Sequence, residues 1–252
     1  MATATVGVQP RTFRPVWRRA ARELRRALLD LLLPPECAVC GESASELCQP
    51  CTRQLAWRPR QACRRCGAAA RPLQTTCGGD HRELRGIDRL VAPWHFAGSG
   101  GALVRRFKLD GQVAAGRLIV RAMANAWLQA GGEGWRRACL TSVPLHRTKL
   151  RQRGFDQAAW LAAETGPRIG LGVLSGVLHR THQTLPQGDP RVVSRSNNVA
   201  GAFTVRHPDL VRGRAVLLVD DVVTSGATVR ECARVLRQAG ATAVAVLVAC
   251  RS

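Results

Sequence analysis

The cysteines of this chain constrain its fold more than any other feature. Seven of the ten lie between positions 37 and 77, and six of those seven form three Cys-x-x-Cys pairs. Such a pair is too close for an unstrained disulfide in most backbones, but it is the usual half of a tetrahedral zinc site. A glycine follows Cys40 and Cys66, where it lets the chain turn so that backbone N–H groups face the sulfurs. The pattern therefore predicts a zinc-binding module.

The spacing predicts two zinc sites. The first cluster consists of two pairs separated by seven residues, Cys37, Cys40, Cys48 and Cys51. The second cluster has three cysteines, Cys63, Cys66 and Cys77, so its fourth ligand must follow Cys77. Asp80 lies three positions after Cys77, which is the spacing of a Cys-x-x-Cys pair. Its neighbour His81 is the softer ligand and the usual partner of three thiolates, so we favour His81. The alternative is that the second cluster has lost its metal.

We interpret residues 34–88 as a double zinc ribbon with a structural role. This segment has too few large apolar side chains to fold by burial alone, and metal binding supplies the missing free energy. No βαβ pattern surrounds the pairs, which argues against a thioredoxin-like redox site. Free thiolate clusters indicate a reducing compartment, so we expect the cytoplasm. The remaining cysteines, Cys139, Cys232 and Cys250, lie in apolar or helical surroundings and are expected in the core.

Positive charge dominates the composition. The formal net charge is +21, from 38 basic and 17 acidic residues, and only Lys108 and Lys149 are lysines. Residues 1–33, a basic segment that we expect to form an amphipathic helix, have seven arginines, and 140–215 have eleven basic residues. This clustering favours a polyanionic partner over a mere compositional bias towards arginine. No apolar run approaches the roughly 20 residues of a membrane span, and the N-terminus does not resemble a signal peptide.

Residues 89–252 have the pattern of an α/β domain. Apolar runs at Arg89–Phe96, Ala138–Val143, Ala215–Val219 and Ala243–Ala249 predict strands. Gly116–Gln129, Gln157–Thr165 and Val229–Ala239 have helical periodicity. Buried strands that alternate with helices indicate a mostly parallel sheet flanked by helices. The polar stretch Arg180–Gly201 is too long for a simple connection, and we expect a functional flap.

One segment carries the chemistry. In residues 217–228 an apolar strand ends in Asp220 and Asp221, and a loop of hydroxyls and glycine then opens a helix. Backbone N–H groups at such a helix start bind anions, and Gly226 permits a close approach. Carboxylates cannot bind phosphate, but they accept hydrogen bonds from sugar hydroxyls or bind a divalent metal. The phosphate-binding residues expected here are Thr224, Ser225, Gly226, Ala227 and Thr228, and the segment predicts a sugar-phosphate site.

This segment resembles the phosphoribosyl-pyrophosphate signature of type I phosphoribosyltransferases. The likeness extends over residues 143–157, 183–187 and 201–203, and with the cysteine pairs the chain resembles the ComF family over roughly 25–250, as a double zinc ribbon before a phosphoribosyltransferase domain. Two residues depart from the family pattern: Asp156 replaces Asn, and Asp80 or His81 replaces the last Cys. The resemblance implies that Asp220 and Asp221 hold the ribose hydroxyls and that residues 224–228 hold the 5′-phosphate.

A basic segment follows the 138–143 strand and suits the pyrophosphate group. Guanidinium groups bind phosphate oxygens in pairs, and a lysine adds a compact charge. A solvated basic turn is the alternative for this spacing alone. Arg180, Arg191 and Arg195 of the flap are candidates to close over the same site, and we assign no histidine to catalysis. The candidate pyrophosphate ligands are Arg147, Lys149, Arg151 and Arg153.

Three functions fit these expectations. The resemblance implies a protein of DNA uptake in natural transformation that binds phosphoribosyl pyrophosphate with Mg²⁺, binds single-stranded DNA, and has a helicase or uptake-machinery partner. Phosphate contacts would dominate DNA binding, because the chain has only five Phe, six Trp and no Tyr. The second is an active phosphoribosyltransferase of salvage metabolism with an unidentified acceptor base. The third makes the ribbon a protein-interaction module beside a motor or channel.

Overall fold

The computed structural model describes residues 35–43, 45–59, 62–71, 74–181 and 199–252. The expected N-terminal amphipathic helix and most of the expected flap, with Arg191 and Arg195, lie outside these residues. Among the helices that are described, none has the length and apolarity needed to cross a membrane.

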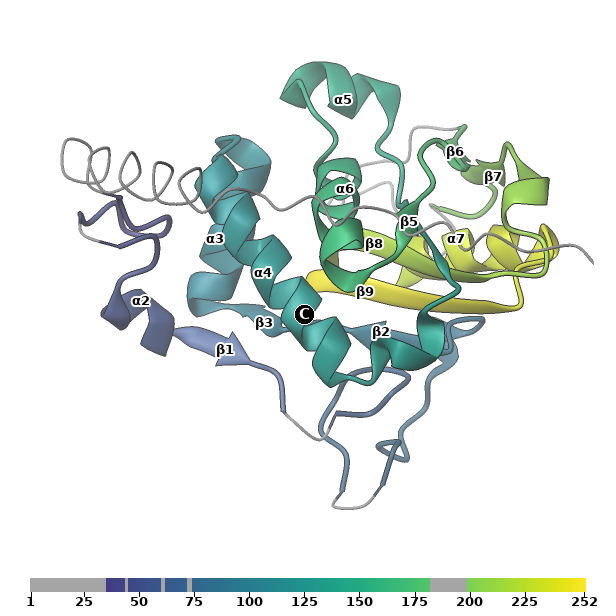
Figure 1. Cartoon of the computed structure of the whole chain (residues 1–252), viewed down its shortest axis with the longest axis horizontal. Coiled ribbons are helices and arrows are strands. Elements are labelled where there is room, and N and C mark those ends of the chain that lie inside the picture. The colour runs from purple at the N-terminus through teal and green to yellow at the C-terminus, as the bar shows by residue number, and fades with distance from the viewer. Residues whose placement is uncertain (1–34, 44, 60–61, 72–73, 182–198) are drawn as a thin grey trace, which may run out of the picture.

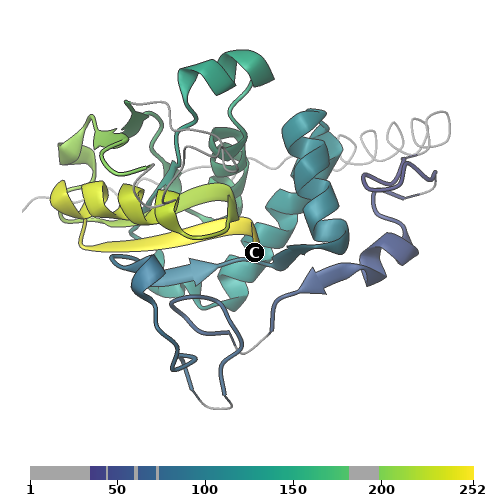
Figure 2. The same ribbon diagram turned by 180° about the vertical axis from the view of Figure 1, so that it is seen from behind.

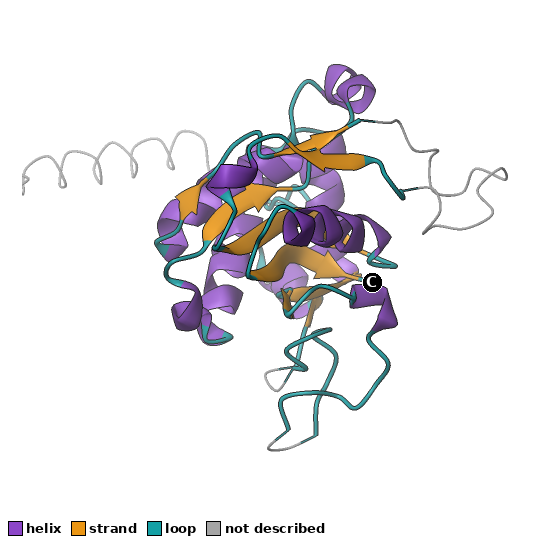
Figure 3. Ribbon diagram, turned by 90° about the vertical axis from the view of Figure 1, so that its right-hand side faces the viewer, coloured by secondary structure: helices purple, strands orange, loops and turns teal. Residues whose placement is uncertain are grey.

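A seven-stranded, mostly parallel sheet forms the centre of the molecule (Figures 1 and 3). Its order is β1-β3-β9-β8-β4-β5, and β2 pairs with β9 ahead of β3. Only β1 runs antiparallel, at the β3 edge. A separate antiparallel hairpin joins β6 and β7. The strands are β1 (Leu55–Trp57), β2 (Arg89–Val91), β3 (Trp94–Ala97), β4 (Cys139–Ser142), β5 (Gly172–Val173), β6 (Leu178–Arg180), β7 (Phe203–Val205), β8 (Ala215–Val223) and β9 (Ala243–Arg251).

Helices cover both faces of the sheet. Figure 1 shows α3 and α4 in front of it, and Figure 2 shows α7 on the opposite side. The helices are α2 (Gln49–Arg53), α3 (Gly98–Leu109), α4 (Val113–Gln129), α5 (Arg147–Arg153), α6 (Gln157–Ile169) and α7 (Ala227–Gln238), with 3₁₀ turns η1 (Arg82–Leu84), η2 (Gly132–Trp135) and η3 (Pro208–Leu210). The chain thus has the expected fold class.

The two central strands divide the core into two layers. In β8, Val216 and Leu218 pack in the layer of α7 and the β6–β7 hairpin, whereas Leu217 and Val219 pack in the layer of α3, α4 and α6. Residues of β9 alternate between the same layers. All of these side chains are fully buried, which explains why both strands read as continuous apolar runs. Cys139, Cys232 and Cys250 are buried in these layers, as expected.

Several element boundaries differ from the sequence expectation. The expected strand Arg89–Phe96 is two strands, β2 and β3, because Pro93 lies between them and cannot donate a ladder hydrogen bond. Helix α3 was not expected, and its start has three glycines within four residues. Helix α6 extends past Pro167 to Ile169 and ends at Gly170, which has φ +71°. The apolar pattern also predicted too early an end for β8, because the strand continues through both aspartates to Val223.

The cysteine-rich segment contributes to the same core. Its strand β1 pairs with β3 through Trp57 and Trp94, and the backbone of Gln54 lies against the start of α3. Ala38, beside the first cluster, is buried in the α3/α4 layer. Cys63 and Cys66 of the second cluster are buried in the α7 layer. The two clusters are therefore packed on opposite layers of the sheet.

Candidate functional site

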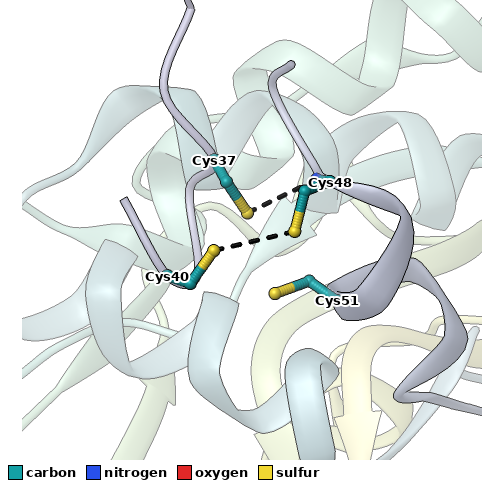
Figure 4. A group of neighbouring side chains, drawn as sticks. All are labelled: Cys37, Cys40, Cys48 and Cys51. Atoms are coloured by element: carbon teal, nitrogen blue, oxygen red, sulfur yellow. Dashed lines mark hydrogen bonds between the residues drawn. The ribbon is translucent and has the colours of Figure 1, made fainter. Parts of the chain in front are cut away.

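Four sulfur atoms converge in the first cluster (Figure 4). The Sγ atoms of Cys37, Cys40, Cys48 and Cys51 all lie within 4.8 Å of one another. The backbone N–H of Cys48 donates to Cys37 Sγ at 3.4 Å, and the Sγ atoms of Cys40 and Cys48 are 3.6 Å apart. Gly41 has φ +81°, which supplies the turn that brings Cys40 to the cluster.

The thiols of the first cluster differ in acidity. Burial would raise the pKa of Cys37, but N–H donors from Cys40, Cys48 and Val39 outweigh it and lower that pKa to about 6. Burial and the neighbouring sulfurs raise the pKa of Cys51 to about 12. All four sulfurs can therefore be thiolates together only if a cation compensates their charges. A tetrahedral zinc ion does so, with all four coordination positions filled by the protein.

The second cluster consists of three sulfurs and one imidazole. His81 Nε2 lies 3.3 Å from Cys63 Sγ and 3.4 Å from Cys77 Sγ, and the Sγ atoms of Cys66 and Cys77 are 3.5 Å apart. The Asp80 carboxylate is turned away, where it accepts the backbone N–H of Arg82 at 2.9 Å and pairs with its guanidinium. The structure thus brings His81, rather than Asp80, to the three sulfurs. Both clusters have donor sets that fit structural zinc.

The acidic pair lies near the carboxyl end of β8 and spans the sheet. By strand alternation Asp220 follows Val216 and Leu218 towards the α7 layer, and Asp221 belongs to the opposite layer. The Asp221 N–H donates to Asp220 Oδ1 at 2.8 Å. Burial, and next the Asp221 carboxylate, raises the pKa of Asp220 well above its ordinary value. The two carboxylates thus differ in environment although they are adjacent in sequence.

A loop of Thr224, Ser225 and Gly226 leads from β8 into α7. Gly226 is the N-cap of α7 with φ +74°, and no side chain among the described residues caps the first N–H groups of this helix. Ala227 and Thr228 form its first turn. An uncapped helix start with a left-handed glycine fits a phosphate group, whose oxygens accept those N–H donors. The loop expected from the sequence therefore leaves backbone N–H donors at the start of α7 without a side-chain cap among the described residues.

The segment 147–153 is the helix α5 rather than a turn. His146 caps it by accepting the Thr148 N–H, and Gly154 ends it with φ +76°. None of its residues is buried, and in Figure 1 the helix stands above the body of the molecule. The structure brings two of the four candidate pyrophosphate ligands, Lys149 and Arg153, to half-buried positions and leaves Arg147 and Arg151 exposed.

Charges of the acidic pair and of α5 act on one another. Burial lowers the pKa of Lys149, the charges of Arg180, Arg153 and Lys108 lower it further, and Asp221 opposes them. Arg180 of β6 in turn acts on Asp220. Lys149 of α5 and Arg180 of β6 are therefore within electrostatic range of the acidic pair.

Sequence reasoning missed two residues of the site. Lys108 Nζ lies 2.8 Å from Asp221 Oδ2, although Lys108 belongs to the unexpected helix α3. Gln157, which is 3% exposed, accepts from Arg153 at 3.1 Å, and its amide lies 3.5 Å from the Lys108 carbonyl. Lys108 lies in no local motif, and Gln157 ends the 143–157 segment of the family likeness without a role being assigned to it. The signal for Lys108 was that it is one of only two lysines.

Asp156 has a structural role. Its side chain accepts the Ala159 N–H at 2.9 Å and so caps α6, and its second oxygen accepts the Leu145 N–H at 3.2 Å. Each contact uses a different carboxylate oxygen as the acceptor. Asn would keep the α6 cap with its amide oxygen, but its NH2 group could not accept the Leu145 N–H. The aspartate that departs from the family pattern therefore keeps the connection between β4 and α6 in place.

Comparison with known proteins agrees with this architecture. A double zinc ribbon domain matches residues 28–79, and a phosphoribosyl transferase domain matches 157–252. The DNA utilization protein YhgH of Escherichia coli K12 is 30% identical over 210 residues, which cover 82% of this chain and 90% of that protein. YhgH of Salmonella typhimurium has the same identity and coverage. Competence protein F of Haemophilus influenzae is 26% identical over 197 residues, 77% of this chain and 85% of that protein.

These relatives align over most of their length, and the two matched domains include the first cluster, all three cysteines of the second cluster, and the acidic pair with its loop. The chain therefore belongs to the ComF family, as a double zinc ribbon joined to a phosphoribosyltransferase-like α/β domain.

Proposed function

We propose that this chain binds phosphoribosyl pyrophosphate with Mg²⁺ and single-stranded DNA, and that it acts in DNA uptake in the cytoplasm. The observation that carries the ligand assignment is the uncapped start of α7 directly after the acidic pair. The proposal divides the chain into residues 1–33, a zinc ribbon at 34–88 and a ligand-binding domain at 89–252.

Each part of the site has one task in this proposal. The N–H groups and hydroxyls of residues 224–228 bind the 5′-phosphate, and Asp220 and Asp221 accept hydrogen bonds from the ribose hydroxyls. Lys149 and Arg153 approach the pyrophosphate, with Arg147 and Arg151 at its outer side. When bound, Mg²⁺ would neutralise pyrophosphate oxygens. The structural zinc ions would hold the two ribbon turns and take no part in chemistry.

The DNA assignment rests on charge and on the relatives. The formal charge is +21, and α5 has two exposed arginines, Arg147 and Arg151. The names of the relatives refer to competence and to DNA utilization. Arginines that contact phosphates bind nucleic acid without regard to its sequence. A helicase or another component of the uptake machinery is the protein partner that this role requires.

The second candidate function is phosphoribosyl transfer in salvage metabolism, which the match to a phosphoribosyl transferase domain favours. In that reaction the bond between C1 of the ribose and the pyrophosphate oxygen breaks, and an acceptor atom bonds to C1. The cationic groups beside Asp220 and Asp221 would stabilise the charge of the leaving pyrophosphate. Pyrophosphate release with a panel of bases and oligonucleotides distinguishes this function from ligand binding alone.

The test of the ligand assignment is titration calorimetry with phosphoribosyl pyrophosphate and Mg²⁺. We expect Asp220→Asn with Asp221→Asn to weaken binding by about 100-fold or more, because two hydrogen bonds to charged acceptors are each worth about 1.5–3 kcal/mol. Asp209→Asn, an exposed aspartate on η3, is the matched control and should bind as the wild type does. Unchanged affinity in the folded double variant would remove the assigned site.

A further inference from the structure

Lys108 contacts the acidic pair from a helix that the sequence signature does not include. It lies in the last turn of α3, and its Nζ atom is 2.8 Å from Asp221 Oδ2. The lysine side chain is 31% exposed and the aspartate side chain 11%. At that burial the ion pair is less screened than a surface pair, and its geometry holds the carboxylate oxygen in one place.

Both lysines of the chain interact electrostatically with the acidic pair, Asp220 and Asp221. Against 38 basic residues in all, only Lys108 and Lys149 are lysines, and the charges of Lys108 and Asp221 both act on the Lys149 ammonium. An ammonium is a compact point charge, whereas a guanidinium is a wide planar fork. Lys108 therefore presents a compact charge to one oxygen of Asp221.

The main chain at Lys108 is itself connected to the basic helix. Its carbonyl lies 3.5 Å from the Gln157 amide, and the other end of that amide accepts from Arg153 at 3.1 Å. Gln157 is buried, so it links the last turn of α3 to Arg153 at the end of α5. Lys108 is thus held between the proposed ribose site and the proposed pyrophosphate site.

We propose that Lys108 is a positioning residue for the ribose diol: its ammonium fixes the Asp221 carboxylate and supplies the positive charge that lets both aspartates accept hydroxyl donors. This inference rests on the proposed function. A diol donates two hydrogen bonds, and only an ionised carboxylate is free of a competing O–H. Two adjacent carboxylates oppose each other's ionisation unless a cation lies beside them.

The electrostatics of the pair agree with this role. Burial and Asp221 raise the pKa of Asp220, and Lys108 opposes them. Removal of the ammonium would raise that pKa further, so Asp220 would need a higher pH to ionise and the loss of binding would shrink as the pH rises. The other titratable groups that act on the pair come from α5, the N-cap of α6, β6, α7 and β9, and they are Lys149, Asp156, Arg180, Cys232 and Cys250.

Calorimetry with ribose 5-phosphate, 2-deoxyribose 5-phosphate and inorganic phosphate tests this role between about pH 7 and pH 9, where lysine stays charged. We expect Lys108→Met to weaken ribose 5-phosphate binding about 10-fold at the lower pH, to recover part of it at the higher pH, and to reduce the preference for ribose over deoxyribose. Phosphate binding should not change. Lys108→Arg keeps the charge and should retain most of the affinity.

Arg106→Met is the matched control, because Arg106 lies on the same helix, contacts Asp110 and the Val39 carbonyl, and should leave all three affinities unchanged. Equal binding of ribose 5-phosphate by Lys108→Met and the wild type would overturn the role of Lys108 alone. An equal loss for phosphate and for ribose 5-phosphate at every pH would do the same. No binding by the wild type would overturn the proposed function, and this inference with it.

Discussion

Gly226 occupies a crowded position in the loop between β8 and α7. Its φ is +74°, and a β-carbon there would lie 2.9 Å from the Glu83 carbonyl oxygen and 2.9 Å from Leu84 Cδ2. Leu84 is buried and belongs to η1, which begins directly after His81 of the second cluster. The loop therefore rests on the end of the zinc ribbon.

We expect Gly226→Ala to destabilise the fold more than Gly170→Ala. Gly170 has φ +71° with nothing within 4 Å of an added β-carbon, so it reports the cost of left-handed backbone alone, about 1–2 kcal/mol. Crowding should add about 1–3 kcal/mol at Gly226. Thermal and denaturant unfolding of both variants measure the difference, and calorimetry with phosphate should detect weaker binding only at Gly226. Equal losses of stability in the two variants would contradict the crowding argument, because they would show that η1 moves away from the added β-carbon at no cost in free energy.

At this scale the sequence predicted residues with local signatures and missed residues that reach the site from elsewhere. The cysteine pairs, His81 and the 220–228 segment are recognisable because adjacent positions supply the chemistry. Lys108 and Gln157 are not, because their contact with the site depends on how α3 and α6 pack on the sheet. Lys108 lies in no motif, and the 143–157 segment that includes Gln157 does not indicate its contact with Lys108.

At the scale of elements, the sequence predicted the buried strands and the long helices but not every boundary. Strands β8 and β9 are buried on both faces, so their apolar runs were clear, yet polar Asp220 and Asp221 concealed the end of β8. Helix α5 has no buried residue and hence no periodicity to detect. Its limits come from a histidine cap and a C-terminal glycine, both weak signals by themselves.

The second ribbon turn provides a prediction at the same scale. We expect the wild type to bind about two zinc ions per chain and His81→Ala to bind about one, because loss of the imidazole leaves three ligands for a tetrahedral ion. Asp80→Ala is the matched control and should keep both ions, since its carboxylate faces Arg82. Elemental analysis of the purified proteins measures the ratio. Loss of an ion from Asp80→Ala, but not from His81→Ala, would reverse the ligand assignment.

At the scale of the whole molecule, the excess of arginine dominates. A chain of net charge +21 attracts any polyanion, and the contacts release counterions from nucleic acid. We expect the affinity for single-stranded DNA to fall about 50-fold between roughly 50 and 200 mM salt if about four phosphates are contacted. Fluorescence anisotropy with labelled oligonucleotides measures this slope.

Two oligonucleotides of equal length and different sequence are the control for that measurement. Phosphate contacts carry no sequence information, so both should bind equally and lose affinity in parallel as salt is added. Binding that does not respond to salt, or that depends strongly on base sequence, would contradict the electrostatic account.

The position of β9 has a consequence for how the protein is made. This strand follows all the other described strands in the chain, yet it lies inside the sheet and pairs with β8, β2 and β3. While a ribosome is still translating the preceding codons, the earlier strands lack their neighbour, and the Cys66 carbonyl lacks the guanidinium of Arg251. Strands β2, β3 and β8 can therefore complete their pairing only after β9 has emerged from the exit tunnel.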